Sequence, residues 1–292
     1  MSVRGIVVLV LAASSVARAE PSAVERSARA IVESQLAAAG SPQAFLATMS
    51  RDAVILGNGS FAVARDSNAA AIAGTLLRAP LLQSILVRID ADGNDAALWL
   101  TADVAFMDAN GCGETDARFV ELAVADHGKW RVVAMSFTST SGLTAPGDEL
   151  GGPHSGPLLD YVASPHKLDE ALRDGSTTMA VVGDVHQLGE LGVGRDRARR
   201  VLAPLRDRNV RVASAVEVRG KTWGFAAGDI MLGATEARVL LVAVQEDRRW
   251  KVVAMHVMRA AGREAVARCT QPLSQPAPMS GGTLPASATI EP

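Results

Sequence analysis

The chain has 292 residues, of which 48% are hydrophobic and 21% are charged, and its formal net charge is −2. This length and composition predict a globular protein of about two domains. The small net charge argues against a nucleic-acid-binding or anionic-membrane-binding protein, which needs a strongly basic surface.

Residues 1–19 have the pattern of a secretory signal. Arg4 precedes an apolar run over residues 5–13, and Ala17-Arg18-Ala19 forms a small-x-small cleavage site before Glu20. The run is too short to span a bilayer as a stable helix, although an uncleaved anchor or a buried N-terminal helix is the alternative. Cleavage would leave 27 basic and 31 acidic residues, a net charge of −4. We expect a periplasmic or extracellular protein with no stable membrane span after cleavage.

The first domain is predicted over residues 20–140. Apolar residues at helical spacing favour helices over residues 23–48, broken at Gly40-Ser41-Pro42. Asn58-Gly59 between two apolar runs is typical of a tight β-turn, and Asp66 begins a helix that ends before Pro80. Short turns then separate four strand-like runs, which predicts an antiparallel meander over Leu82–Asp90, Ala96–Met107, Ala117–Ala125 and Lys129–Phe137.

The second domain is predicted over residues 166–262, with its entry helix inside a Gly- and Pro-rich linker at 141–165. Asp196 begins a helix that runs to about Leu205. The same order of elements follows, with strands at Val210–Val218, Thr222–Leu232, Glu236–Gln245 and Arg249–Met258. Residues 263–292 are rich in Pro, Ser, Gly and Thr and are predicted to be a disordered tail.

A near-exact repeat supports two copies of one unit. Trp130-Arg-Val-Val-Ala-Met and Trp250-Lys-Val-Val-Ala-Met lie 120 positions apart. A gapless alignment also places Trp223 opposite Trp99, so the four tryptophans of the chain form two equivalent pairs. The same alignment places Asp103 opposite Ala227, which predicts that the polar residues of the two copies differ.

The chain has two cysteines, Cys112 and Cys269. In an oxidising compartment they could form a disulfide that ties the tail to the first copy. Two unrelated thiols are the alternative, because the sequence does not give the Cα separation that a bridge requires.

The order of elements, ending in a Trp-basic-Val-Val strand, resembles the SnoaL-like branch of the nuclear-transport-factor-two-like superfamily. The matching residues are the strand at Ala53, the Arg65-Asp66 step and Gly128-Lys-Trp-Arg-Val-Val, with counterparts at Ala180, Arg195-Asp196 and Arg249-Trp-Lys-Val-Val. The resemblance implies an α+β protein of two cone-shaped domains, each a curved antiparallel sheet wrapped over helices around an apolar pocket. Members include isomerases, cyclases and dehydratases as well as proteins without known catalysis, so the fold alone does not give a function.

Several residues could carry chemistry in such a pocket. Strand alternation places Trp250, Val252, Ala254 and His256 on one face, where His256 could act as a general base or make a structural hydrogen bond. Asp103 and Asp229 could be carboxylates with raised pKa values inside a cone, or carboxylates satisfied at the surface.

Other candidates lie at the pocket mouth and on its walls. Asp184 and His186 share a face and could form an acid–base pair, but two ligands make a poor metal site. The four tryptophans are core or pocket wall. The basic stretch after Arg195 is typical of a solvated helix face. The predicted pocket is lined by Trp99, Asp103, Trp130, Trp223 and Trp250.

We therefore expect a protein that holds a small apolar ligand or a protein partner without catalysis. We expect no cofactor, no metal and no nucleic acid, and we expect the two domains to pair within the chain through their sheets, which would otherwise expose an apolar face. The alternative is an isomerase, cyclase or dehydratase acting on a small apolar molecule in the second domain, where four side chains would converge: Asp184, His186, Asp229 and His256.

Overall fold

The computed structural model describes residues 20–38, 41–76, 81–108, 114–140, 145, 147–148, 155–174, 178–182, 188–206 and 208–259. The proposed signal segment, both cysteines and the C-terminal tail lie outside these residues, as do Asp184 and His186. No helix in the described part of the chain is long and apolar enough to cross a membrane.

The protein has an α+β fold with two domains, each built on a six-stranded curved sheet. The first domain follows the predicted order of helices, hairpin, helix and four-strand meander. Its elements are α1 (Ala23–Ala37), α2 (Pro42–Leu46), β1 (Met49–Gly57), β2 (Ser60–Val63), α3 (Ser67–Leu76), β3 (Leu81–Gly93), β4 (Ala97–Asp108), β5 (Glu114–Asp126) and β6 (Lys129–Ser139).

The second domain repeats this order, with a first entry helix of 5 residues in place of 15. It also contains a strand, β8, that the sequence did not predict. Its elements are α4 (Leu159–Ala163), α5 (Pro165–Ala171), β7 (Thr178–Val182), β8 (Glu190–Val193), α6 (Arg195–Arg206), β9 (Val210–Arg219), β10 (Trp223–Leu232), β11 (Thr235–Glu246) and β12 (Arg249–Arg259). Helix α4 is the entry helix expected inside residues 141–165, and Leu158, Leu159 and Val162 are buried in the core of the second domain.

The two sheets have the same strand order, β2-β1-β6-β5-β4-β3 and β8-β7-β12-β11-β10-β9. The last four strands of each domain form the predicted antiparallel meander. The first hairpin of each domain joins the end of that meander through a parallel pair, β1 with β6 and β7 with β12. Each sheet is therefore mixed rather than wholly antiparallel.

Local sequence explains where key elements begin and turn. Ser22 and Glu25 form a capping box at the start of α1: the Ser22 hydroxyl accepts from the Glu25 amide, and the Glu25 carboxylate accepts from the Ser22 amide. Asn58 and Gly59 both have positive φ angles, 45° and 80°, as the predicted two-residue turn between β1 and β2 requires.

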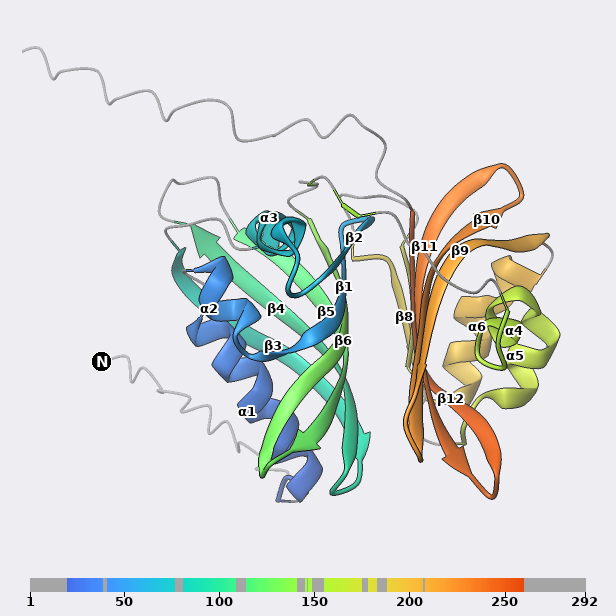
Figure 1. The fold of residues 1–292 in the computed structure, drawn as a ribbon, viewed down its shortest axis with the longest axis horizontal. Coiled ribbons are helices and arrows are strands. Elements are labelled where there is room, and N and C mark those ends of the chain that lie inside the picture. Colours follow the sequence, from blue (N-terminus) through green and yellow to red (C-terminus); the bar gives the residue numbers. More distant parts are fainter. Residues whose placement is uncertain are drawn as a thin grey trace, which may run out of the picture.

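The two sheets pack against each other through their outer faces, and the helices lie on the opposite, inner face of each sheet (Figure 1). The layer between the sheets is an apolar cluster drawn from both domains, including Val54, Leu122 and Ala134 from the first and Leu240 and Val242 from the second. Arg173 of the second domain also crosses this boundary, because its guanidinium pairs with Asp92 at 2.5 Å and lies 5.3 Å from the ring centre of Trp99. The domains therefore pair within the chain through their sheets.

Candidate ligand-binding site

Two of the predicted pocket residues, Trp99 and Asp103, lie outside the cone of the first domain. They share the face of β4 that looks toward the second sheet, and Trp99 is buried in the cluster between the sheets. Trp223 and Asp229 occupy the corresponding face of β10. The prediction that these four residues line the cones is wrong, because the strand face that carries them packs against the other domain.

The strand registers also correct the pairing of the tryptophans. Trp99 lies opposite Leu122 on the neighbouring strand. The counterpart of Leu122, 120 positions later, is Val242, and Phe225 lies opposite Val242. Trp99 therefore corresponds to Phe225 and not to Trp223. Equivalent residues of β4 and β10 are thus 126 positions apart, a spacing that the gapless alignment did not find.

The same registers make Asp103 and Asp229 equivalent, whereas the sequence alignment separated them. Asp103 lies opposite Arg118, and Asp229 lies opposite Arg238, 120 positions later. In each domain the arginine Nε donates to the aspartate Oδ1 at 2.7 Å. Each carboxylate is thus held by an ion pair on the outer face of its sheet.

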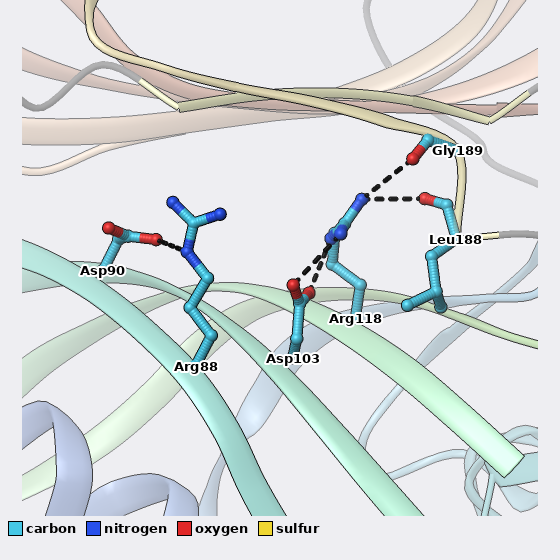
Figure 2. A network of polar contacts seen from close by, with 6 residues as sticks. All are labelled: Arg88, Asp90, Asp103, Arg118, Leu188 and Gly189. Atoms are coloured by element: carbon cyan, nitrogen blue, oxygen red, sulfur yellow. Dashed lines mark hydrogen bonds and ion pairs between the residues drawn. The ribbon is translucent and has the colours of Figure 1, made fainter. Parts of the chain in front are cut away.

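The Arg118 ion pair also joins the two domains, as Figure 2 shows. The Nη1 atom of Arg118 donates to the carbonyl oxygens of Leu188 and Gly189 in the second domain, at 3.0 and 3.2 Å. Asp103 holds the guanidinium in place with a second bond at 3.1 Å. In the second domain, the Asp229 carboxylate accepts an additional hydrogen bond from the hydroxyl of Ser214 at 2.9 Å. These contacts support a structural role for both carboxylates.

A β-bulge moves His256 out of the cone. On β12 the register shifts between Val242 and Ala243 of the facing strand, so that Val253 is an extra residue. Val252 before the bulge packs inside the cone, whereas Ala254 after it packs between the sheets. The prediction of one continuous face from Trp250 to His256 is therefore wrong, because one extra residue reverses the alternation.

His256 meets its own counterpart in the first domain. Its Nδ1 lies 2.9 Å from the hydroxyl of Ser136, which is 120 positions earlier and follows an equivalent bulge in β6. The pKa of His256 is lowered to about 3, mainly by burial and also by the nearby Arg118 charge, while the Ser136 contact opposes this shift. The imidazole is neutral near pH 7 and fully buried between the sheets, so this position suits a structural hydrogen bond and not a general base.

Trp130 and Trp250 lie at equivalent places beside open grooves. Trp130 lines a groove of about 440 Å³ between α1 and the start of β6. Trp250 lines one of about 410 Å³ between α5 and the start of β12, with Lys167, Arg249 and Lys251 around it. Both indoles also pack against the core of their own domain, so they act as wall and core together.

The cone of the first domain is filled by aromatic side chains. Phe106, Phe119 and Phe137 are all buried in its core, and the rings of Phe119 and Phe137 meet edge to face with centres 6.4 Å apart. Gly57 is required beside them, because a Cβ at this position would lie 2.2 Å from the Phe137 ring.

The first cone also contains one buried acid that the sequence pattern did not predict. Glu121 of β5 and Gln35 of α1 are both fully buried. Burial raises the pKa of Glu121 to about 8, and the neighbouring Gln35 amide opposes that rise. The carboxyl is therefore mostly protonated at pH 7. An acidic residue flanked by Val120 and Leu122 on a predicted strand was the available signal.

The second cone has smaller side chains at the same three positions. The strand registers place Leu232, Val239 and Val257 where the first domain has Phe106, Phe119 and Phe137. A cavity of about 330 Å³ opens at the mouth of this cone, a volume within the usual range for small-molecule sites. Its described lining is Val181, Pro204, Leu205, Arg208, Leu232, Thr235, Ala237, Val257 and Arg259.

The interior beyond this cavity is tightly packed and apolar. A void of about 10 Å³ lies deeper in the cone and shares Leu205 and Leu232 with the cavity. The position that Glu121 occupies in the first domain is Leu241 in the second, which is also fully buried. Among the residues that the structure describes, no group of three or more His, Cys, Asp or Glu is arranged to hold a metal ion.

Comparison with known proteins gives structural resemblance only. No known family matches the sequence, and no curated protein matches it. A protein with a cystatin-like fold from Nostoc punctiforme is 11% identical, covering 40% of this chain and 92% of its own, with a TM-score of 0.35. A proposed scytalone dehydratase from Novosphingobium aromaticivorans is 10% identical over 43% of this chain and 87% of its own, with a TM-score of 0.32. An NTF2-like protein of unknown function from Shewanella baltica is 14% identical over 39% and 91%, with a TM-score of 0.29.

Proposed function

We propose that this chain is an exported protein of two SnoaL-like, NTF2-like domains that binds a small apolar molecule in its second domain without catalysing a reaction. Export is supported by the signal-like pattern of residues 1–19. The SnoaL-like assignment is supported by the repeated Trp-basic-Val-Val strand and by the same strand order in both sheets.

The observation that carries this proposal is the contrast between the two cones. Three phenylalanines fill the first cone, and smaller aliphatic residues replace them in the second, where the cavity lies. Apolar surface such as Leu205, Leu232 and Val257 favours burial of an apolar ligand at roughly 25 cal/mol per Å². The first domain then acts as the packed partner that covers the outer face of the second sheet.

Binding is favoured over catalysis by the chemistry of the cavity lining. Among its described residues the ionisable side chains are Arg208 and Arg259, and arginine does not exchange protons near neutral pH. Asp229 and His256, proposed from the sequence as catalytic, are on the sheet face that packs against the first domain. A general base must reach its substrate directly or through one water molecule.

The proposal is tested by binding of N-phenyl-1-naphthylamine, a neutral apolar probe whose fluorescence rises on leaving water. We expect saturable binding to the wild-type protein. Val181 lies opposite Val257 as Gly57 lies opposite Phe137, so it is the counterpart of Gly57. The variant Val181→Gly/Leu232→Phe/Val257→Phe therefore places first-domain residues around the cavity and should weaken binding at least about tenfold. Thr235→Trp, at an exposed position of the mouth, should weaken it as well without disturbing the core.

The matched control is Val218→Phe, which adds a phenyl ring on the outer face of β9, where Val218 is 37% exposed. This variant should bind the probe as the wild type does. Absence of probe binding by the wild type would contradict a ligand site in the second cone. So would wild-type affinity for the probe in the folded triple variant and in Thr235→Trp.

A further inference from the structure

The rim of the second cavity carries positive charge without a matching acid. Arg208 follows the end of α6, and Arg259 is the last residue of β12, so two separate elements bring guanidinium groups to the same cavity. Thr235 adds a hydroxyl from the start of β11. No carboxylate side chain is among the described lining residues, and Glu236, next to Thr235, is not part of the lining.

Three arginines of α6 pair with carboxylates, whereas no such pair is found for the two rim arginines among the described residues. Arg199 and Arg206 of α6 both pair with Asp169 at 2.8 Å, and Arg195 pairs with Asp174. Among the described residues, Arg208 and Arg259 have no ion pair with a carboxylate. Two guanidinium groups without an internal acid make an anion-binding rim, since each can donate to a carboxylate.

At the position of Arg259 the two domains differ in charge. The strand register makes Ser139 the counterpart of Arg259 in the first domain, and Ser139 is fully buried there. Its amide donates to the Asn58 side chain at 2.8 Å. The first domain thus has a filled cone and a neutral, buried residue at this place, and the second has a cavity and a cation.

We propose that the ligand of the second domain is amphipathic, with an apolar chain and one anionic group, as in a medium-chain carboxylic acid. The chain lies against Leu205, Leu232 and Val257, and the carboxylate lies at the mouth between Arg208 and Arg259. This inference rests on the proposed apolar-ligand function and specifies its substrate class.

The experiment compares decanoate with decanol as competitors of bound N-phenyl-1-naphthylamine, at neutral pH and low salt. The two competitors share a ten-carbon chain and differ in the charge of the head group. We expect decanoate to displace the probe at about tenfold lower concentration than decanol, as expected for two solvent-exposed ion pairs. In Arg208→Gln/Arg259→Gln this advantage should disappear, while displacement by decanol is unchanged. Arg200→Gln, at an exposed position of α6 that does not line the cavity, is the matched control.

Each outcome separates this inference from the proposed function. Equal displacement by decanoate and decanol in the wild type would overturn the anionic preference and leave the apolar site standing. A preference for decanoate that survives in the double arginine variant would also overturn the assignment to Arg208 and Arg259. If neither the probe nor decanol binds the wild type, the proposed function itself fails, and the inference fails with it.

Discussion

Glutamine at position 121 should make the protein more stable than the wild type at pH 7, by about 3 kcal/mol. Glu121 is fully buried in the first cone, and burial raises its pKa from 4.5 to about 8. Glutamine has nearly the same shape and cannot ionise. The glutamine side chain also has an amide group that can form a hydrogen bond with Gln35. A leucine at position 121 would leave the buried Gln35 amide without this polar neighbour.

The sign of the effect follows from the two pKa values. The folded protein holds the Glu121 proton more tightly than the unfolded chain, so the stabilisation due to this proton is complete below pH 4.5 and is lost as the pH rises through about 8. The free energy of unfolding of the wild type should therefore decrease over this range relative to Glu121→Gln, and the difference should be larger at pH 9 than at pH 7.

Urea unfolding at pH 5, 7 and 9 measures this difference directly. Glu33→Gln, on the exposed side of α1, is the control and should follow the wild-type profile. Parallel pH profiles for Glu121→Gln and the wild type would show that the buried carboxyl does not titrate as inferred. The equivalent position of the second domain, Leu241, already carries an apolar residue at a buried site, so the fold tolerates the loss of charge there.

Replacing His256 with serine, the residue at the equivalent place in the first domain, should reduce the sensitivity of the protein to acid. Burial, together with the nearby Arg118 charge, lowers the pKa of His256 from 6.5 to about 3. The unfolded chain therefore takes up a proton below pH 6.5 that the folded protein does not. This uptake costs the wild type about 3 kcal/mol of stability at pH 4.5 relative to neutral pH.

The readout is the change in the free energy of unfolding between pH 7 and pH 4.5, since serine also removes packing at both pH values. The loss of unfolding free energy between pH 7 and pH 4.5 should be smaller in His256→Ser than in the wild type by about 3 kcal/mol. His127→Ser is the matched control, because the His127 side chain is 98% exposed. If His256→Ser loses as much stability in acid as the wild type and His127→Ser do, the buried neutral imidazole of His256 is not the cause of the acid sensitivity.

The repeated pattern of elements could be predicted from the sequence, but the faces of two strands could not. The hexapeptides at Trp130 and Trp250 gave the correct offset for the last two strands. Alternation then failed at Val253, because a single bulged residue reverses every side chain after it and leaves no mark in the apolar pattern. His256 was placed in the cone for this reason.

Only part of the candidate site could be predicted from the sequence. At the correct offset, Phe119 aligns with Val239 and Phe137 with Val257, which indicates a loss of volume in the second cone. The alignment did not show that Gly57 makes room for Phe137, because that contact joins strands 80 residues apart. The rim arginines were hidden for a similar reason, since a helix end and a strand end meet only in the folded chain.

The central claim, that the cavity of the second cone is the ligand site, is tested most directly by methyl NMR during titration with N-phenyl-1-naphthylamine. We predict shifts of the methyl signals of Leu205, Leu232 and Val257, which line the cavity. The methyl groups of Ile72 and Val132 in the filled first cone should stay unchanged. Shifts confined to the first cone, or no shifts at saturating probe, would contradict the claim.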